Sequence, residues 1–413
     1  VDPAVVVKVG AARRLDALHL RAGHRIERPA FGAVLAGRLG TVRDGAFRPV
    51  EARHVAAARQ RRPDDAVSID VDAARRVAGL HRIDIGILNR RRFVDLRNAG
   101  LLALCVPEEH GGLGAGFETY CLVAEQLAQG NASTALTFNM HCLTMLMMGP
   151  LMDGLELPSE IRNRHKESSA RRYREVVEHG VFYGQPHSEP LESGSADQLD
   201  IGGRRFGTTA KRVDGGYMIN GSKFFVSSSG AADYFATPAL LLAEGTWEER
   251  TLYLSVPREA PGVEFSGDWD PLGMRSTVSR NMSLKDVWAP NDAEILPPGV
   301  FGQLFQRQPH IFIAFPAVFL GLMQAAYDYT LAYLTGKAPG APGARGESPV
   351  GGAALAETLF TLEATRALFY RAISEQRLDP PIEVVQRARA AHVQVQRAVV
   401  QLTGEAVRIC GGR

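Results

Sequence analysis

Hydrophobic residues between about residues 117 and 150 recur at intervals of three, four and seven, which is typical of helices with one buried face. They fall into two runs, Leu122, Val123 and Leu127 in the first and Ala135, Leu136, Leu143 and Leu146 in the second. Asn131 and Ser133 lie between the runs, and either side chain can cap the first turn of a helix. We therefore expect two helices, the second of which begins near residue 131.

The pattern changes near Val181 to short apolar segments separated by Gly, Pro and Asp, which is typical of strands. Strands are expected at 251–256, 262–265 and 278–287. Between two further apolar segments, Asn220-Gly221 has the residue types that a type I′ hairpin turn requires, so a hairpin is expected there. Residues 181–296 are interpreted as an antiparallel β domain.

Helical spacing returns after Pro297-Pro298, with helices expected at about 315–334 and 352–376 and after Pro380-Pro381. The apolar run from Ile311 to Met323 is shorter than the roughly 18 residues of a membrane span, so it is interpreted as a buried helix. The order predicts an α+β chain with a helical domain at 66–180, the β domain at 181–296 and a helical domain at 297–413. Residues 1–65 are rich in Arg and Ala and are expected to be a poorly ordered extension without chemistry.

Composition narrows the function classes only slightly. The 413-residue chain has a net charge of +2, which lacks the basic excess of a nucleic-acid-binding protein. Its four cysteines, Cys105, Cys121, Cys142 and Cys410, have no metal-ligand spacing. They are predicted to be buried, unpaired residues in a reducing compartment, and with no signal peptide in view the expected location is the cytoplasm.

Several local strings, in one order, resemble the acyl-CoA dehydrogenase family over about residues 90 to 413. They are Leu101–Gly112, Ser188-Glu189-Pro190 with Gly194-Ser195, Gly216–Ser227, Leu272–Thr277, Gly321–Ala326 and Gly411-Gly412. Each string is weak alone, and their order and spacing make the resemblance specific. It implies an N-terminal helical domain, a central antiparallel β-barrel or β-sandwich and a C-terminal four-helix bundle.

The resemblance also implies bound FAD. Ser227 matches the hydroxyl that bonds flavin N5, and Phe225 matches the aromatic residue beside the isoalloxazine ring. Ser188 matches the hydroxyl at the pyrimidine edge, and Ser195 matches a serine near the cofactor and acyl-CoA. Each of these serines has a plainer interpretation as a solvated or backbone-bonded side chain, and Phe225 as a core residue.

The resemblance also implies an oligomer, because family members usually pair into dimers or tetramers. Gly411-Gly412 matches a loop of a neighbouring subunit that approaches the adenosine part of the cofactor, and is otherwise a helix C-cap. Arg408 stands where the family has Gln and is predicted to serve a phosphate through its planar guanidinium. A homodimer or homotetramer in contact through the C-terminal helices is expected.

The residue that removes the substrate proton is not evident. In most family members it is a Glu in a segment after the Gly-Gly loop, and the given sequence ends at Arg413. A minority places Glu and Arg on the first C-terminal helix, where this chain has Ile311 and Phe312. His310 is the ionisable neighbour, so it is the candidate base, with a helix-start residue as the alternative.

Three functions stay open at this point. The first is α,β-dehydrogenation of an acyl-CoA substrate, which also allows an electron-transfer protein as acceptor. The second is a flavin-dependent monooxygenase of the same fold, for which His141 and His187 gain interest. The third is an inactive homologue that only assembles with partners.

Two tempting motifs are set aside. Gly112–Phe117 resembles a dinucleotide fingerprint but has Phe117 where the third Gly is required. His141 and His187 are each interpreted first as structural hydrogen-bonding residues.

Overall fold

The structure is a computed structural model that describes residues 6–8, 68–70, 90–189, 207–339, 341 and 349–411. The chain divides into two compact units, Val1–Asp70 and Val71–Arg413. In the first unit β1 (Val6–Lys8) and β2 (Ser68–Asp70) pair as parallel strands. Apart from β1, the extension predicted at 1–65 lies outside the described residues.

The second unit begins, in its described part, with α2 (Arg90–Asn98), η3 (Leu101–Ala103) and η4 (Glu108–His110). The Gly-rich segment that follows packs on its own backbone. A Cβ atom on Gly112 would lie 2.0 Å from the carbonyl oxygen of Val106, and the Gly114 N–H donates to that oxygen at 2.9 Å. Because only Gly permits this approach, the glycines serve loop packing, in agreement with the rejection of a dinucleotide fingerprint.

Helix α3 (Phe117–Met148) is interrupted at Asn131, whose φ of −156° and ψ of 103° are not helical. The Asn131 side-chain oxygen accepts hydrogen bonds from the backbone N–H of Thr134 at 2.9 Å and from its hydroxyl at 3.1 Å. This side chain therefore satisfies an N–H group that the second half of the helix leaves free. The prediction of two helices is confirmed, with Asn131 rather than Ser133 as the cap.

His141 on α3 joins three segments of the chain. Its Nε2 lies 2.8 Å from the Leu102 carbonyl oxygen, and its Nδ1 accepts the Tyr183 N–H at 3.2 Å. Its ring stacks on Phe182 with centroids 5.1 Å apart. Burial lowers the pKa of His141 to about 4, although the Leu102 carbonyl acts in the opposite direction. His141 is thus a neutral structural residue that donates from Nε2.

After α4 (Ser159–Arg174) and η5 (Glu175–His179) the chain forms one sheet of eight strands. Seven strands follow the order β10-β7-β6-β4-β5-β9-β8, and β3 pairs with β6. The pairs β4–β6 and β3–β6 are parallel, so the sheet is mixed rather than antiparallel as predicted. The predicted strands at 251–256, 262–265 and 278–287 correspond to β7, β8 and β9. The strands are β3 (Tyr183–Gly184), β4 (Thr209–Val213), β5 (Gly216–Val226), β6 (Tyr234–Leu241), β7 (Thr251–Pro257), β8 (Val263–Ser266), β9 (Arg280–Pro290) and β10 (Glu294–Leu296).

Strand β5 continues through Asn220-Gly221 without a chain reversal, so the hairpin turn predicted there is wrong. The Asn220 side chain is bonded to Asp286 of β9, whose backbone N–H it accepts at 2.9 Å. Gly221 has a φ of 155° at a shift in the pairing register, and a Cβ there would lie 2.6 Å from the Thr208 Cα. These residues form a β-bulge, a use of Asn and Gly that local sequence does not separate from a turn. The tight turn lies at 214–215 instead, where Gly215 has a φ of 73°.

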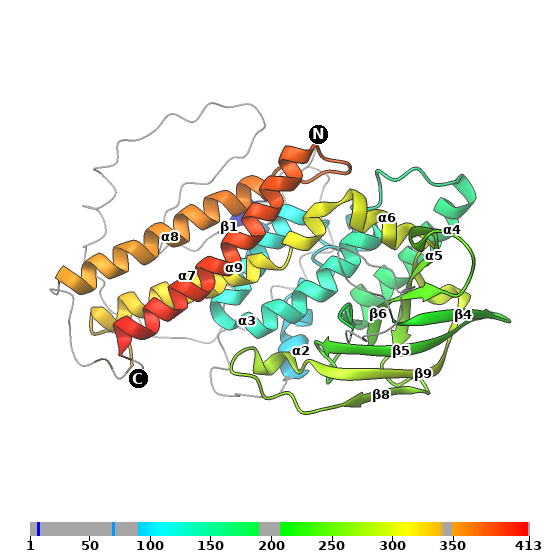
Figure 1. Cartoon of the computed structure of the whole chain (residues 1–413), viewed down its shortest axis with the longest axis horizontal. Helices are drawn as coiled ribbons and strands as arrows, with labels where there is room; N and C mark the ends of the chain where they lie inside the picture. The colour runs from blue at the N-terminus through cyan, green and yellow to red at the C-terminus, as the bar shows by residue number, and fades with distance from the viewer. Residues whose placement is uncertain are drawn as a thin grey trace. The chain divides into compact units, whose positions relative to one another are not determined.

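Four long helices pack together: α3, α7 (Pro316–Leu334), α8 (Pro349–Ile373) and α9 (Ile382–Cys410). Figure 1 shows α7, α8 and α9 extending away from the sheet. Gly321 allows α7 to approach α3 closely, because a Cβ there would lie 2.1 Å from the Glu125 carbonyl oxygen. The shorter α6 (Val300–Arg307) and η8 (Pro309–Ile313) connect β10 to this bundle.

The apolar run of the sequence analysis lies in this bundle. Pro309–Leu334 is long and apolar enough to cross a membrane by length and composition alone, yet 67% of its most apolar stretch is buried in the chain. That burial fits the predicted core helix. The four cysteines are likewise buried and unpaired, as predicted.

Stability is expected to fall as the pH is lowered from about 6.5 to about 4, because of His141. Above pH 6.5 the ring is neutral in both states, whereas below it the unfolded chain binds a proton that the folded chain refuses. A folded-state pKa of about 4 against an ordinary value of 6.5 corresponds to about 3 kcal/mol in full, of which about 2 kcal/mol is lost by pH 5. Urea unfolding of the wild type and of His141→Gln at pH 7.5 and pH 5 measures this difference.

The pH dependence should be smaller in His141→Gln and unchanged in the control His179→Gln, whose side chain is 71% exposed. Equal pH dependence in all three proteins would contradict this account of His141.

Candidate functional site

The candidate site begins where β5 ends. Phe225 has a φ of 53° and its side chain is 57% exposed, and Ser228 has a φ of 68°. Residues other than Gly seldom adopt such angles, and strained positions cluster at functional sites. The strain turns one aromatic ring toward solvent and the following serines inward.

A chain of hydroxyl groups runs inward from Ser227. The Ser227 Oγ lies 2.9 Å from the Ser279 Oγ. The Ser279 Oγ in turn lies 2.7 Å from the Thr277 Oγ1. Thr277 Oγ1 donates to the Met274 carbonyl oxygen at 2.8 Å. Each hydroxyl has one proton, so Ser279 donates to Thr277 and Ser227 donates to Ser279. The oxygen of Ser227 is left with acceptor capacity for a group outside the chain of hydroxyls.

Ser188 lies beside this strand end. Its carbonyl oxygen accepts the backbone N–H of Phe224 at 3.0 Å, which forms an isolated bridge between the two segments. The structure therefore brings Ser188, Phe225 and Ser227 together, as the resemblance implies. Ser195 lies outside the described residues.

The loop between β8 and β9 also borders the candidate site, because its Trp269 contacts Phe225. The Trp269 ring meets the Phe225 ring edge-on at 5.9 Å, and its Nε1–H donates to the Met274 carbonyl at 3.1 Å. Met274 has a φ of 58° and its sulfur accepts the Ser133 hydroxyl of α3 at 3.7 Å. The helical and β parts of the second unit thus meet at this site.

Sequence reasoning missed Ser279 and Ser228. Ser279 directly precedes β9, and Thr277 ends a short 3-10 helix, so no strand period links the two residues. The contact of Ser279 with Ser227, 52 residues away, has no signal in the local sequence. Ser228 likewise carries no such signal, and its buried Oγ has no hydrogen-bond partner within the described structure.

These residues fit a flavin. An exposed aromatic ring offers a π face, Ser227 offers an acceptor, and the orphaned Ser228 hydroxyl is a buried polar atom that a ligand can satisfy. In the part of the chain that the structure describes, no cluster of three His, Cys, Asp or Glu side chains could hold a metal ion.

His310 lies elsewhere. It belongs to η8 and is fully buried, and neither ring nitrogen makes a hydrogen bond of ordinary geometry among the described residues. Burial lowers its pKa, and the nearby carbonyl of Ala372 on α8 opposes that effect. The ring thus faces the helices of the bundle. The role of base for His310 stays a prediction.

The two positions where some family members carry Glu and Arg are apolar here. Ile311 is buried, and Phe312 is 46% exposed with its ring 5.1 Å from that of Phe305. Neither side chain can accept a proton.

Arg408 and Gly411 lie at the end of α9 and away from the sheet (Figure 1). The Arg408 side chain is 63% exposed and binds Glu405 at 2.7 Å, and Gly411 caps the helix with a φ of 78°. Within one chain they do not contact Ser227, and their roles at the cofactor stay predictions. Gly412 lies outside the described residues.

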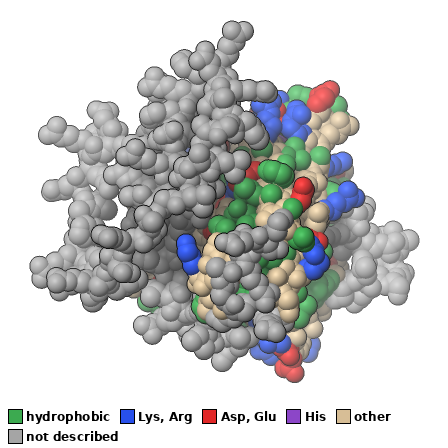
Figure 2. All heavy atoms as spheres, turned by 90° about the vertical axis from the view of Figure 1, so that its left-hand side faces the viewer, with side chains coloured by type: hydrophobic (Ala, Val, Ile, Leu, Met, Phe, Trp, Pro, Cys, Tyr) green, Lys and Arg blue, Asp and Glu red, His purple; other side chains and the backbone are tan. Residues whose placement is uncertain are grey.

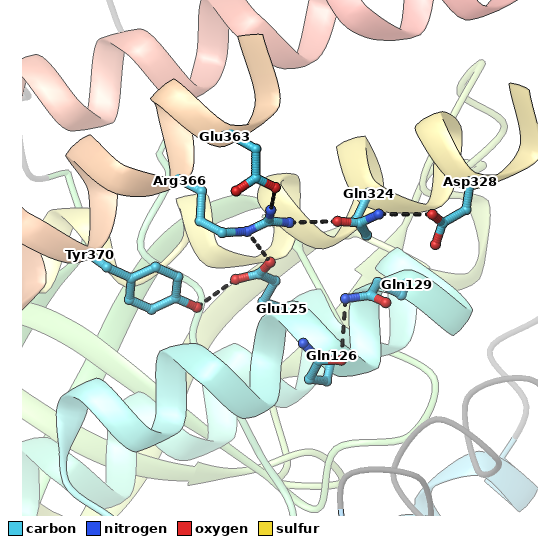
Figure 3. Close-up of polar contacts among 8 residues, drawn as sticks. All are labelled: Glu125, Gln126, Gln129, Gln324, Asp328, Glu363, Arg366 and Tyr370. Atoms are coloured by element: carbon cyan, nitrogen blue, oxygen red, sulfur yellow. Dashed lines mark hydrogen bonds and ion pairs between the residues drawn. The ribbon is translucent and has the colours of Figure 1, made fainter. Parts of the chain in front are cut away.

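Among the described residues of the bundle, Glu125 of α3 is a deeply buried carboxylate, and its surroundings are shown in Figure 3. Its two oxygens accept from Arg366 Nε at 2.9 Å and from the Tyr370 hydroxyl at 2.6 Å. Arg366 also donates to Gln324 of α7 at 2.8 Å. Burial alone would lower the pKa of Arg366, but the neighbouring carboxylates outweigh it and raise that pKa. Glu125 is therefore a paired, structural carboxylate that ties three helices together.

Comparison with known proteins agrees with this arrangement. Residues 74–153, 201–287 and 313–413 match the N-terminal, middle and C-terminal domains of acyl-CoA dehydrogenase, respectively. The chain is 30% identical over 244 residues to "Putative acyl-CoA dehydrogenase YdbM" of Bacillus subtilis, covering 59% of this chain and 58% of that protein. It is 27% identical over 248 residues to a dibenzothiophene monooxygenase of Rhodococcus erythropolis, covering 58% and 54%. The match thus spans little more than half the length of these relatives.

Among solved structures, FMN-bound TdsC from Paenibacillus sp. A11-2 shares the fold with a TM-score of 0.67 and 23% identity, covering 83% of this chain and 87% of that one. With three matching domains in the family order, the chain belongs to the acyl-CoA dehydrogenase family of flavoprotein oxidoreductases.

Proposed function

We propose that the chain binds FAD and catalyses α,β-dehydrogenation of an acyl-CoA thioester. The observation that carries the proposal is the end of β5, where the exposed Phe225 ring stands beside the hydroxyl chain of Ser227, with Ser188 on the adjoining segment. The family and the relative YdbM support the thioester substrate.

When bound, the flavin supplies a hydride acceptor at N5. With its own proton committed to Ser279, Ser227 would accept a hydrogen bond from the N5–H of reduced flavin, since oxidised N5 has no proton to donate. Phe225 offers its face to the ring, and the hydroxyl of Ser188 meets the polar edge. FAD is proposed rather than FMN because Arg408 and Gly411, supplied by a neighbouring subunit, suit its pyrophosphate and adenosine parts.

The reaction removes one hydrogen as a proton from the α carbon and one as hydride from the β carbon, which leaves a double bond. The proton needs a base above the substrate. Ile311 and Phe312 cannot supply it, and most family members carry this Glu in a segment after the position of Gly411-Gly412. His310 is the ionisable neighbour in this chain, but its complete burial among the bundle helices favours a packing role over that of the base.

A second candidate, a flavin-dependent monooxygenase, is favoured by a row of aromatic rings. Ring centroids of His187 and Phe305 are 5.9 Å apart, and those of Phe305 and Phe312 are 5.1 Å apart. Because His187 directly precedes Ser188, the row leads toward the proposed flavin site. Such a surface suits a flat aromatic substrate, and the Rhodococcus relative is a dibenzothiophene monooxygenase.

We also propose that the chain forms a homodimer or homotetramer through its C-terminal helices. Val393, Val400 and Val407 of α9 are 43%, 73% and 60% exposed, and their spacing of seven places them on one stripe. Figure 2 shows hydrophobic side chains gathered in a band on one face of the molecule. An apolar stripe that pairs with its own copy forms a closed, symmetric contact. A cytoplasmic location and an electron-transfer protein as acceptor complete the proposal.

Mixing the flavin-loaded chain with saturated acyl-CoA esters in the absence of oxygen tests the reaction. We expect the long-wavelength flavin absorbance to bleach, because the hydride passes to the flavin, and free CoA is the control that leaves it unchanged. No bleaching, together with oxygen uptake that depends on reduced flavin and dibenzothiophene, would favour the monooxygenase. Failure of both reactions would favour an inactive homologue.

His310→Leu separates a base from a packing residue. The imidazole is buried without a well-formed hydrogen bond, so a Leu of similar volume should leave the free energy of unfolding unchanged or raise it by about 1 kcal/mol. We expect the rate of flavin reduction to stay within a few-fold of wild type. A loss of about 100-fold in that rate, with flavin binding retained, would instead assign His310 as the base.

A further inference from the structure

A buried ion pair lies close in the chain to Ser188 and Phe225 of the candidate flavin site. Lys223 of β5 is 1% exposed and the Glu189 side chain is 5% exposed, and the ammonium group binds the carboxylate. Lys223 Nζ also donates to the Pro238 carbonyl of β6 at 2.8 Å. Burial lowers the pKa of Lys223 to about 8, and Glu189 acts in the opposite direction. Since apolar residues of similar volume often give equal stability, such a pair needs an explanation other than stability.

The Glu189 carboxylate holds more than the lysine. It accepts the backbone N–H of Gly207, and its two oxygens lie 3.3 and 3.2 Å from the N–H of Thr208, just before β4. One side chain thus connects the segment of Ser188 to the start of β4 and to β5. Through Lys223 it also reaches β6.

The ion pair and the flavin candidates are adjacent in the chain on both sides. Ser188 precedes Glu189, and Phe224, whose N–H donates to the Ser188 carbonyl at 3.0 Å, follows Lys223. Phe225, with its positive φ, comes next. Two interactions at successive residues, the Ser188–Phe224 backbone bond and the Glu189–Lys223 ion pair, therefore fix the Ser188 segment against the end of β5. A shift in either interaction moves Ser188 relative to Phe225.

We propose that Lys223 and Glu189 are positioning residues that set the distance between Ser188 and the Phe225–Ser227 segment and thereby the shape of the flavin site. This inference rests on the flavin binding proposed above. A group that supports a ligand-binding side chain contributes to affinity without touching the ligand, and in metal sites the removal of such a group commonly weakens binding by about 10-fold or more.

The test compares fold stability with flavin binding. Glu189→Gln and Lys223→Met each leave one buried partner, whereas the double variant E189Q/K223M leaves no unpaired charge and is expected to melt near the wild-type temperature. We expect the double variant to bind FAD about 10-fold more weakly, with an altered visible circular dichroism spectrum of the bound flavin. Glu189→Asp keeps both charges but shortens the acidic side chain by one methylene group. It should likewise weaken FAD binding and alter the circular dichroism spectrum of the bound flavin.

Lys285→Met is the matched control, because Lys285 and Glu264 form an exposed pair at 3.1 Å on the same sheet. It should leave both readouts unchanged. Wild-type affinity and spectrum in both the folded double variant and Glu189→Asp would overturn the positioning role alone. Absence of FAD uptake by the unaltered chain would overturn the flavin assignment and this inference together.

Discussion

The chain leaves β5 through a strained turn, and the candidate site depends on how that turn is held. Positive φ values at Phe225 and Ser228 each cost of order 1 kcal/mol or more, so surrounding contacts must maintain them. The Ser228 N–H donates to the Thr277 carbonyl at 2.8 Å, and the Ser229 hydroxyl donates to the Val278 carbonyl at 2.5 Å. These bonds pull the serines inward and leave the Phe225 ring facing outward.

The opposing loop is strained as well and is supported by the helices. Met274 and Val278 have φ values of 58° and 43°, on either side of η6 (Arg275–Thr277), which packs against α3. The same helix carries Glu125, whose pairing with Arg366 fixes it to α8. A buried carboxylate left without its guanidinium partner is strongly destabilising, so this network keeps α3 in place. Helix α3 thus contacts the strained loop at η6 and is joined to α8 through Glu125.

Much of this arrangement could be predicted from the sequence, where the responsible interactions are local. Asn131 was one of two predicted caps, because a helix start needs a side-chain acceptor near its first N–H groups. Three strands were predicted from short apolar segments between Gly, Pro and Asp residues. The turn predicted at Asn220-Gly221 was wrong because a bulge and a turn demand the same backbone freedom. Only the long-range pairing with Asp286 decides between a bulge and a turn. Ser279 was missed because its role depends on contact with Ser227, 52 residues away.

The most direct measurement of the central claim is a titration of the purified chain with FAD, followed by quenching of flavin fluorescence, alongside Phe225→Ala and a Phe360→Ala control. Phe360 of α8 is 58% exposed, which matches Phe225 at 57%, so the two substitutions remove similar exposed rings. The account predicts saturable binding by the wild type and the control, and binding weakened by about 10-fold in Phe225→Ala, as loss of a stacked ring of about 1 kcal/mol or more implies. Saturable binding of equal affinity in all three proteins, or none in any, would contradict a flavin site at the end of β5.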